Sequence, residues 1–378
     1  EPLSKSIEIY SRAAGHSNIL YMIWVFILAG AFAAVAGKIG AVQATVDIIL
    51  SVFPAHMVVP MLFVAACFIS FSIGTSVGTV VALAPLAVEM AAETGGDLAF
   101  YIAAVLGGAF FGDNLSFISA TTIAATRSQD CDMADKFRAN LWLALPAAVF
   151  TLVLYVWMCG SSDVPHISSG PTDFWLMAPY LVVIVAAASG INVCIVLTAG
   201  IAMSIAVGCV RGQTLIDLAS SMGAGVEGMG NLIIITLLAS GMLGIIKALG
   251  GIDYLLQTLT RRLNGPRGTQ GVIVALVSLV NLCTANNTVA IITVGGIARD
   301  ISRPAGVDGR KVASLLDSAS CIVQCLIPYG AQTLLATQLA GISPAAPFPY
   351  LYYPWALAVM VVLSIVFRFP RFKKATPR

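Results

Sequence analysis

The stretch from Gly112 to Thr122 (GDNLSFISATT) holds a carboxylate, an amide and four hydroxyl groups within eleven residues. It interrupts an apolar run, because residues 99–111 carry no charge and residues 123–125 are apolar again. In hydrocarbon such groups must find partners inside the protein or in a water-filled cavity. Asp113 is therefore a candidate functional residue within a membrane segment. The alternative is that Asp113 caps a helix end near the membrane surface.

A buried carboxylate surrounded by neutral oxygens can exchange a proton for a small cation. Burial favours the protonated form of the group and a bound cation favours the ionised form, so H⁺ and Na⁺ compete for it. We predict that Asp113 is this cation- and proton-binding residue. Hard cations prefer oxygen ligands. The same stretch offers further oxygens on Asn114, Ser116, Ser119, Thr121 and Thr122.

The composition places these residues in a membrane protein. Of 378 residues, 58% are hydrophobic and 10% are charged, with a mean hydropathy of +0.93, whereas soluble domains carry about 25% charged residues. Long apolar runs, without the short alternating segments of a barrel, predict an all-α polytopic helical bundle. There is no zinc-type HExxH motif, P-loop or metal-type cysteine pattern. We therefore expect a protein that is not an enzyme and has no cofactor.

Apolar runs predict helices that cross or enter the membrane, and polar residues interrupt several of them. The expected helical runs are residues 19–35, 42–53, 57–71, 80–93, 100–111, 141–158, 176–188, 193–210, 232–246, 272–282, 289–298, 312–327 and 352–367. The four interruptions are residues 72–79, 112–122, 283–288 and 328–333. The polar, glycine-rich residues 212–230 predict a linker or an interfacial helix.

The interruptions form two pairs with the same order of features, a polar break, an apolar helix and a second break. Paired interrupted segments in corresponding positions indicate the binding site of a secondary transporter. We predict two structural repeats, inverted, with discontinuous or re-entrant helices. A parallel repeat, or small residues that only allow close helix packing, are the alternatives. The other breaks add the candidate site residues Thr75, Ser76, Thr79, Asn286, Asn287, Thr288 and Gln332.

A second acid, Asp317, lies within the apolar run 312–327. It is a further candidate for binding a cation or a proton. The alternative is an ion pair with Arg310 or Lys311 near the membrane surface. Among the candidates, Asp113 and Asn286 are the expected Na⁺ ligands.

The expected organisation has five segments. Residues 1–18 form an N-terminal juxtamembrane segment, residues 19–159 the first transmembrane half, residues 160–231 a connection, residues 232–368 the second half, and residues 369–378 a basic tail. Because cytoplasmic loops carry an excess of Lys and Arg, the tail is predicted to be cytoplasmic. By the same rule the loops 127–138, 247–267 and 299–311 are expected on that side, and the loop 160–172 outside.

The string from Phe111 to Thr122 resembles the signature of the NhaC family of Na⁺/H⁺ antiporters, which commonly reads GDNLSPISDTT. The similarity continues at residues 131–132, 284–288 and 327–330 and covers most of the chain from residue 69 to residue 338. It implies membership in the ion-transporter superfamily, whose paired hairpin tips use similar Ser-Asn-Thr sequences. Phe117 stands where this family has Pro, and Ala120 stands where it has Asp.

These observations predict a secondary active transporter, with Na⁺/H⁺ antiport by alternating access and Asp113 as the cation- and proton-binding carboxylate. The alternative is Na⁺- or H⁺-coupled transport of an amino acid or an organic acid; a channel is the third possibility. The expected location is the bacterial inner membrane. The expected partners are the lipid bilayer, a small cation, a small organic substrate under the alternative, and a second copy of the chain, with no nucleic acid.

Overall fold

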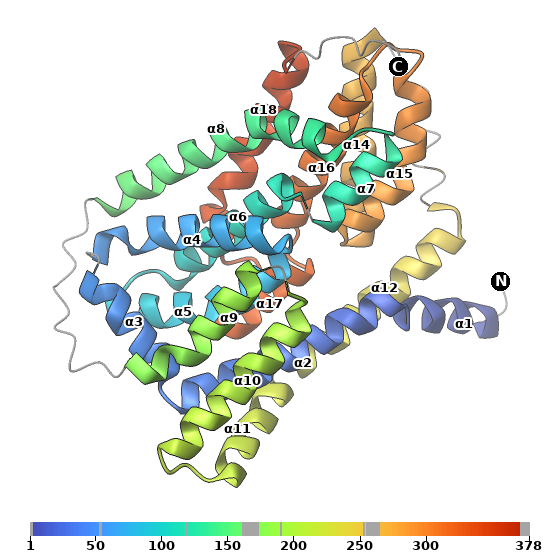
Figure 1. The fold of residues 1–378 in the computed structure, drawn as a ribbon. Coiled ribbons are helices and arrows are strands. Elements are labelled where there is room, and N and C mark those ends of the chain that lie inside the picture. Colours follow the sequence, from blue (N-terminus) through green and yellow to red (C-terminus); the bar gives the residue numbers. More distant parts are fainter. Residues whose placement is uncertain are drawn as a thin grey trace.

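The computed structural model describes residues 3–52, 55–117, 119–160, 174–189, 191–251, 254 and 265–370, and in this part of the chain all regular structure is helical (Figure 1). The first helices are α1 (Leu3–Ala14), α2 (Ser17–Lys38), α3 (Ala41–Val52), α4 (Val58–Ile73), α5 (Ser76–Thr94), α6 (Leu98–Leu115), α7 (Ala120–Ser128), α8 (Met133–Cys159) and α9 (Ala178–Ala188). They are followed by α10 (Val193–Val210), α11 (Leu215–Gly228), α12 (Gly230–Ala248), α14 (Gly265–Thr284), α15 (Asn287–Ser302), α16 (Gly309–Leu326), α17 (Ala331–Ala340) and α18 (Tyr352–Val366). Short 3₁₀ turns lie at Ala55–Met57, Phe174–Met177 and Phe348–Tyr350.

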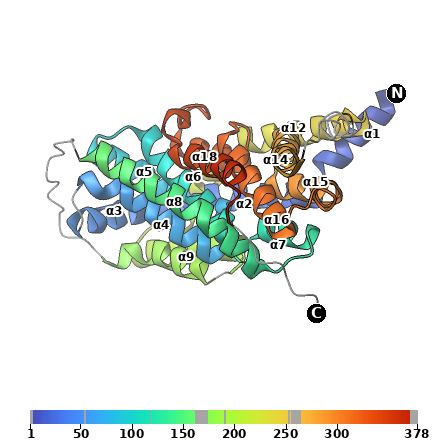
Figure 2. The same cartoon turned by 90° about the horizontal axis from the view of Figure 1, so that it is seen from above.

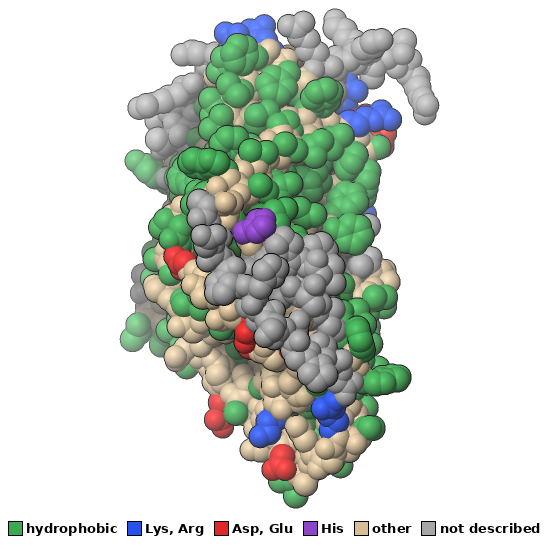
Figure 3. Space-filling view, turned by 90° about the vertical axis from the view of Figure 1, so that its left-hand side faces the viewer, with side chains coloured by type: hydrophobic (Ala, Val, Ile, Leu, Met, Phe, Trp, Pro, Cys, Tyr) green, Lys and Arg blue, Asp and Glu red, His purple; other side chains and the backbone are tan. Residues whose placement is uncertain are grey.

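The protein is an all-α integral membrane protein. Eight helical stretches in the described part of the chain are long and apolar enough to cross a bilayer. Many large apolar side chains are exposed, and hydrophobic residues gather in the upper part of the face drawn in Figure 3. On α8 the exposed apolar residues include Trp142, Val149, Phe150, Val153 and Trp157. Since these positions recur on one side of a helix, they form a surface suited to lipid.

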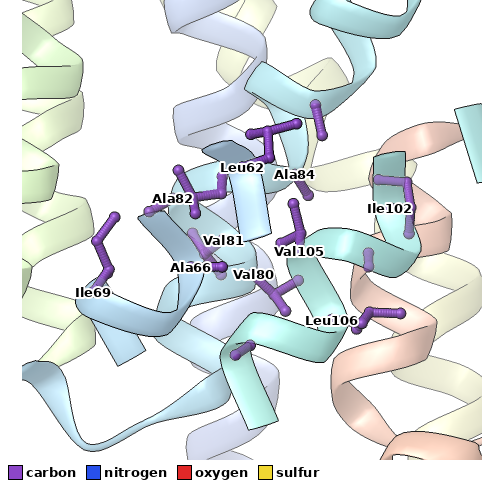
Figure 4. Close-up of a cluster of buried hydrophobic side chains, with 14 of the residues drawn as sticks. Leu62, Ala66, Ile69, Val80, Val81, Ala82, Ala84, Ile102, Val105 and Leu106 are labelled. Carbon is purple, nitrogen blue, oxygen red and sulfur yellow. The ribbon is translucent and has the colours of Figure 1, made fainter. Parts of the chain in front are cut away.

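Helix α6 lies at the centre of the larger core. It packs against α4, α5, α8, α16, α17 and α18, and Figure 4 shows apolar side chains of α4, α5 and α6, among them Leu62, Val80 and Val105, meeting in one cluster. A second apolar cluster joins α14, α15 and α16 to Ala125 of α7. The two groups of helices lie on opposite sides of the molecule seen from above (Figure 2), and α16 belongs to both clusters through Leu315 and Leu316.

Glycines allow α4 and α6 to approach closely. A Cβ atom at Gly112 would lie 2.2 Å from the Cβ atom of Ser70 and 2.4 Å from the backbone nitrogen of Phe71. Ser70 also donates a hydrogen bond to the carbonyl oxygen of Ala109 at 2.5 Å. This crossing places the last turn of α6, which carries Asp113, beside the end of α4.

We expect Gly112→Ala to destabilise the protein by about 1–3 kcal/mol, because the added methyl group forces two packed backbones apart. The matched control is Gly271→Ala in the interior of α14, where an added Cβ meets no atom within 4 Å. Alanine favours helix over glycine, so the control variant should be neutral or slightly stabilised. Thermal unfolding of both variants in detergent measures the difference. Equal melting temperatures would contradict the predicted close contact.

The four interruptions separate helices, and their backbones match in pairs. Gly74 and Ala285 both have positive φ angles, of 73° and 46°. The following N-cap residues, Thr75 and Asn286, are both extended with φ angles of −147°. The α6–α7 and α16–α17 breaks also resemble each other, because Ser119 and the corresponding Gly330 are extended N-caps with ψ angles of 140° and 143°.

Helix packing is also reciprocal between the halves. Helix α5 of the first half packs against α17 of the second, and α15 of the second half packs against α7 of the first. Such exchanged contacts are what a pair of related repeats would produce. The inverted relation, the re-entrant character of the helices and the five-segment division stay predictions.

The breaks are shorter than the polar stretches suggested. Helix α5 begins at Ser76 rather than at residue 80, and α6 continues through Asp113 and Asn114 to Leu115. The helix persists there because partners on other helices satisfy the two polar side chains, while the helical bond from the Ser116 nitrogen to the Gly112 oxygen is retained at 2.7 Å. The polar run 212–230 contains the helix α11, which packs against α2.

Some predictions concern residues outside the described part of the chain. They include residues 1–2 of the N-terminal segment, residue 53 of the run 42–53, Ile118 of the signature, almost all of the loop 160–172, residues 252–253 and 255–264 of the loop 247–267, and residues 371–378 of the basic tail.

Candidate functional site

A cavity of about 350 Å³ lies where the four breaks meet. The N-terminal ends of four helices line it. They contribute the N-cap residues Thr75 of α5, Ser119 of α7 and Asn286 of α15, and the first helical residues Ser76 of α5 and Ala331 of α17. Nine of the fourteen residues predicted from the sequence line this cavity: Asp113, Ser119, Thr121, Thr75, Ser76, Asn286, Asn287, Thr288 and Gln332. The structure therefore brings together residues from all four interruptions.

Of the described residues that line the cavity, one is acidic, and it is Asp113. It lies in the last turn of α6 and is 6% exposed. Ser76 holds both carboxylate oxygens, because its backbone N–H donates to Oδ1 at 2.9 Å and its hydroxyl donates to Oδ2 at 2.5 Å. The free N–H groups at a helix N-terminus favour a negative charge, so the start of α5 stabilises an ionised Asp113.

A chain of hydrogen bonds runs from Asp113 across both halves of the protein. Gln332 in α17 donates to the Ser76 hydroxyl at 2.9 Å. Gln324 in α16 donates to Gln332 Oε1 at 3.1 Å and to the carbonyl oxygen of Ala285 at 2.9 Å. The carboxylate in one half is thus linked to the α14–α15 break in the other.

Several predicted residues hold the backbone of the α6–α7 break, and two of them, Ser119 and Thr121, also line the cavity. Thr122 donates to the carbonyl oxygen of Ser116 at 2.7 Å, and Thr121 donates to the carbonyl oxygen of Asp113 at 3.3 Å. Ser119 accepts from the Thr122 nitrogen, which caps α7. Asn114, Ser116, Thr122 and Thr79 are buried and do not line the cavity. The Thr122 and Thr79 hydroxyls donate to backbone carbonyl oxygens, and the Asn114 amide donates to the Ser318 hydroxyl at 3.2 Å, so these buried groups find partners inside the protein.

At the α14–α15 break, only some of the side-chain hydrogen-bonding groups have partners. Asn286 accepts from the backbone nitrogen of Val289 at 3.0 Å and so caps α15. Asn287 accepts from the Thr288 nitrogen, and its buried Nδ2 atom has no hydrogen-bond partner in the described part of the chain. Both residues face the cavity, where their amide groups are available to a ligand.

Behind the cavity lies an ion pair that the sequence did not indicate. Lys136 Nζ lies 2.7 Å from Asp317 Oδ2, and neither side chain has any exposed surface. Lys136 also donates to the carbonyl oxygen of Asn114 at 2.5 Å and to the Thr122 hydroxyl at 2.7 Å. Asn140, one turn along α8, contacts Asn114 Oδ1 and Asp317 Oδ2, each at 2.9 Å.

The alternative reading of Asp317, an ion pair with Arg310 or Lys311 near the membrane surface, is wrong. Arg310 pairs with Asp308 at 2.7 Å, and Lys311 donates to the Ser364 hydroxyl and, at 2.6 Å, to the carbonyl oxygen of Phe369. The charge pattern predicts that Lys136 lies in the loop 127–138, but α8 begins at Met133 and buries this lysine. The spacing of Lys136 and Asn140, four residues apart at the start of an apolar helix, was the signal that could have revealed this face.

Ala120 is the first residue of α7, is exposed and lines the cavity. This is the position at which the sequence signature has Asp. The cavity therefore carries one carboxylate from the signature rather than two. No group of three or more His, Cys, Asp or Glu residues that could hold a metal ion occurs in the described ranges.

Residues 74–78 read Gly-Thr-Ser-Val-Gly, which matches the spacing of the nucleophile elbow of α/β-hydrolases. That elbow joins a strand to a helix, whereas here helix α4 precedes the string. Ser76 donates its hydroxyl hydrogen to Asp113, and of the described residues lining the cavity none is a histidine. The geometry therefore lacks the base that activates such a serine.

Comparisons with known proteins show which proteins this chain is similar to. A family model described as the Na⁺/H⁺ antiporter family matches residues 12–159 and 171–370. The Na⁺/H⁺ antiporter NhaC of Alkalihalophilus pseudofirmus is 26% identical over 90% of this chain and 80% of its own length. The malate-2H⁺/Na⁺-lactate antiporter of Bacillus subtilis is 23% identical over 82% of this chain and 73% of its own length. Among solved structures, the Alcanivorax borkumensis YdaH transporter is 14% identical, covers 97% of this chain and 89% of its own, and superposes with a TM-score of 0.46.

Proposed function

This chain belongs to the Na⁺/H⁺ antiporter family, and we propose that it exchanges Na⁺ for H⁺ with Asp113 as the residue that binds each in turn. The membership expected from the signature is thereby confirmed. The observation that carries the role of Asp113 is its position, since it is a buried carboxylate on the wall of a cavity lined otherwise by neutral groups.

The contacts of Asp113 suit an exchange site. Two hydrogen bonds from Ser76 favour the ionised carboxylate, and burial favours the protonated one. These opposed influences let a proton leave when Na⁺ arrives and return when Na⁺ departs. Na⁺ would take oxygens of Asp113 and Asn286, with hydroxyl groups of the α5 and α7 starts completing an oxygen-rich shell.

The place of the site between the two groups of helices supports alternating access. The Asp113–Ser76–Gln332 chain joins α6 and α5 of the first half to α17 of the second. Movement of one group of helices against the other would expose Asp113 to one side of the membrane at a time. One carboxylate that faces each side in turn couples the two ion flows.

The test of antiport is reconstitution of the protein in liposomes that contain a pH-sensitive dye. Addition of Na⁺ outside should drive protons out of the lumen and raise the internal pH, whereas choline chloride at the same ionic strength should not. Parallel additions of Li⁺ and K⁺ define the cation selectivity. If the protein moves no protons in response to any of the three alkali cations, antiport is refuted.

A small carboxylate is the second candidate substrate. Four helix N-termini end at the cavity, and such termini attract anions; about 350 Å³ also exceeds what one small cation requires. Under this proposal a carboxylate and Na⁺ occupy the cavity together. Isothermal titration with lactate, malate and amino acids, each with and without Na⁺, tests it, since Na⁺-dependent heats support co-binding and their absence refutes it.

The remaining proposals concern location and partners. A bacterial inner membrane, with a cytoplasmic C-terminus, agrees with the basic loops, and the lipid bilayer covers the apolar faces. We propose that Na⁺ and H⁺ are the only small partners that antiport requires, so no cofactor takes part. A homodimer is the proposed assembly.

A further inference from the structure

The exchange site contains three charged groups that act on one another. The charges acting on Asp113 come from Asp317 in α16 and Lys136 in α8. Among the described residues the site therefore holds two carboxylates and one ammonium group.

Lys136 and Asp317 are arranged as a fixed pair. An ammonium group has three hydrogens to donate, and Lys136 has three acceptors within 2.7 Å, on Asp317, Asn114 and Thr122. The paired oxygen of Asp317 also accepts from Asn140 at 2.9 Å. Neither member of the pair is among the residues that line the cavity, so the pair lies behind its wall.

Asp113 has the opposite arrangement. It lines the cavity, and its partner Ser76 is neutral. With Ala120 at the start of α7, no second carboxylate of the signature faces the same space. The exchangeable negative charge of the described site is therefore one.

We propose that Lys136 is an internal counter-ion that cancels the charge of Asp317, so that the protein exchanges one Na⁺ for one H⁺ and moves no net charge across the membrane. The proposal rests on the proposed antiport. The site is neutral when Asp113 holds Na⁺ and neutral when it holds H⁺. The empty site carries one uncompensated negative charge, and burying such a charge is costly, which disfavours movement of the empty carrier and keeps the exchange obligatory.

The experiment measures the gradients at which exchange stops. Proteoliposomes with internal pH dye receive opposed Na⁺ and H⁺ gradients, while K⁺ and valinomycin hold the membrane potential at zero, inside-negative or inside-positive. A membrane potential acts only on net charge that crosses the bilayer. We expect proton movement to stop when the Na⁺ and H⁺ concentration ratios are equal, at all three potentials.

A balance point that shifts with the potential overturns the one-to-one exchange while leaving the antiport itself intact. Absence of any Na⁺-evoked pH change overturns both proposals. The two failures are therefore distinguishable in one preparation.

Variants of the pair separate its charge role from a structural one. Asp317→Asn leaves the Lys136 charge uncompensated, so Asp113 becomes its counter-ion, and we expect exchange to fall at least about tenfold. The double variant Lys136→Met/Asp317→Leu is neutral at this place and should keep the equal-ratio balance point. Melting temperatures in detergent are measured in parallel. If folded Asp317→Asn exchanges at the wild-type rate, Lys136 does not act as a counter-ion.

The reverse change adds a charge to the cavity. Ala120→Asp supplies a second carboxylate beside Asp113, and we expect its balance point to depend on potential, as for about two protons per Na⁺. Ala120→Asn, which has the same shape without the charge, is the matched control and should keep the balance point of the unmodified chain. A potential-independent balance point for folded, active Ala120→Asp would overturn the charge count.

Discussion

Asp113→Asn should lose Na⁺-driven proton movement by at least about 100-fold, the size of effect expected when a group that carries the proton is removed. The amide has the shape of the carboxylate. Its oxygen can still accept a hydrogen bond from the Ser76 nitrogen, which lies 2.9 Å from Asp113 Oδ1 in the unmodified protein. It cannot take up or release a proton, and it offers Na⁺ no negative charge. The measurement is the dye response of proteoliposomes to Na⁺.

Two controls frame this result. Asp113→Glu keeps the charge and shifts its position, so we expect reduced but detectable exchange. Asp97→Asn alters a carboxylate at the other end of the same helix, where Asp97 caps α6; asparagine is an equally good cap, so exchange should be unchanged. Wild-type exchange by Asp113→Asn would show that another group carries the proton, and Asp317 would then be the next to test.

The second large effect concerns stability. Lys136→Met leaves Asp317 charged and unpaired at a place without solvent exposure. Breaking a buried ion pair on one side costs about 3–5 kcal/mol. Three hydrogen bonds that join α8 to α6, α7 and α16 are lost together. We therefore expect a strongly lowered melting temperature and a low yield of folded protein from the membrane.

Removing both charges should restore much of that loss. In Lys136→Met/Asp317→Leu, apolar side chains replace the pair, a change that is often neutral or stabilising. A double-mutant cycle on melting temperature measures the coupling between the two residues. Arg12→Met is the control, because its pair with Glu8 on α1 is exposed and such pairs contribute little. Equal stability of Lys136→Met and the unmodified chain would contradict a charged pair.

The sequence by itself determined the class of protein and the centre of the site. A low content of charge and long apolar runs establish a helical membrane protein, because a polar backbone in lipid must satisfy itself within a helix. The same argument identified Asp113, because placing a carboxylate in hydrocarbon is costly and such a residue can therefore be recognised in the sequence. The nine predicted residues that line the cavity were found from the polar interruptions and the order in which those interruptions recur.

The tertiary structure decided which partner each polar group has. Asn114 and Thr122 belong to the same polar stretch as Asp113, yet they bind Lys136 rather than facing the cavity. Asn140 donates a hydrogen bond to Asp317, which is 177 positions away in the sequence. Lys136, the charged partner of Asp317, was missed because the charges around it predict a loop. Local composition reports the cost of burying a charge, but the group that compensates it depends on which helices pack together, and that choice is made by contacts distant in sequence.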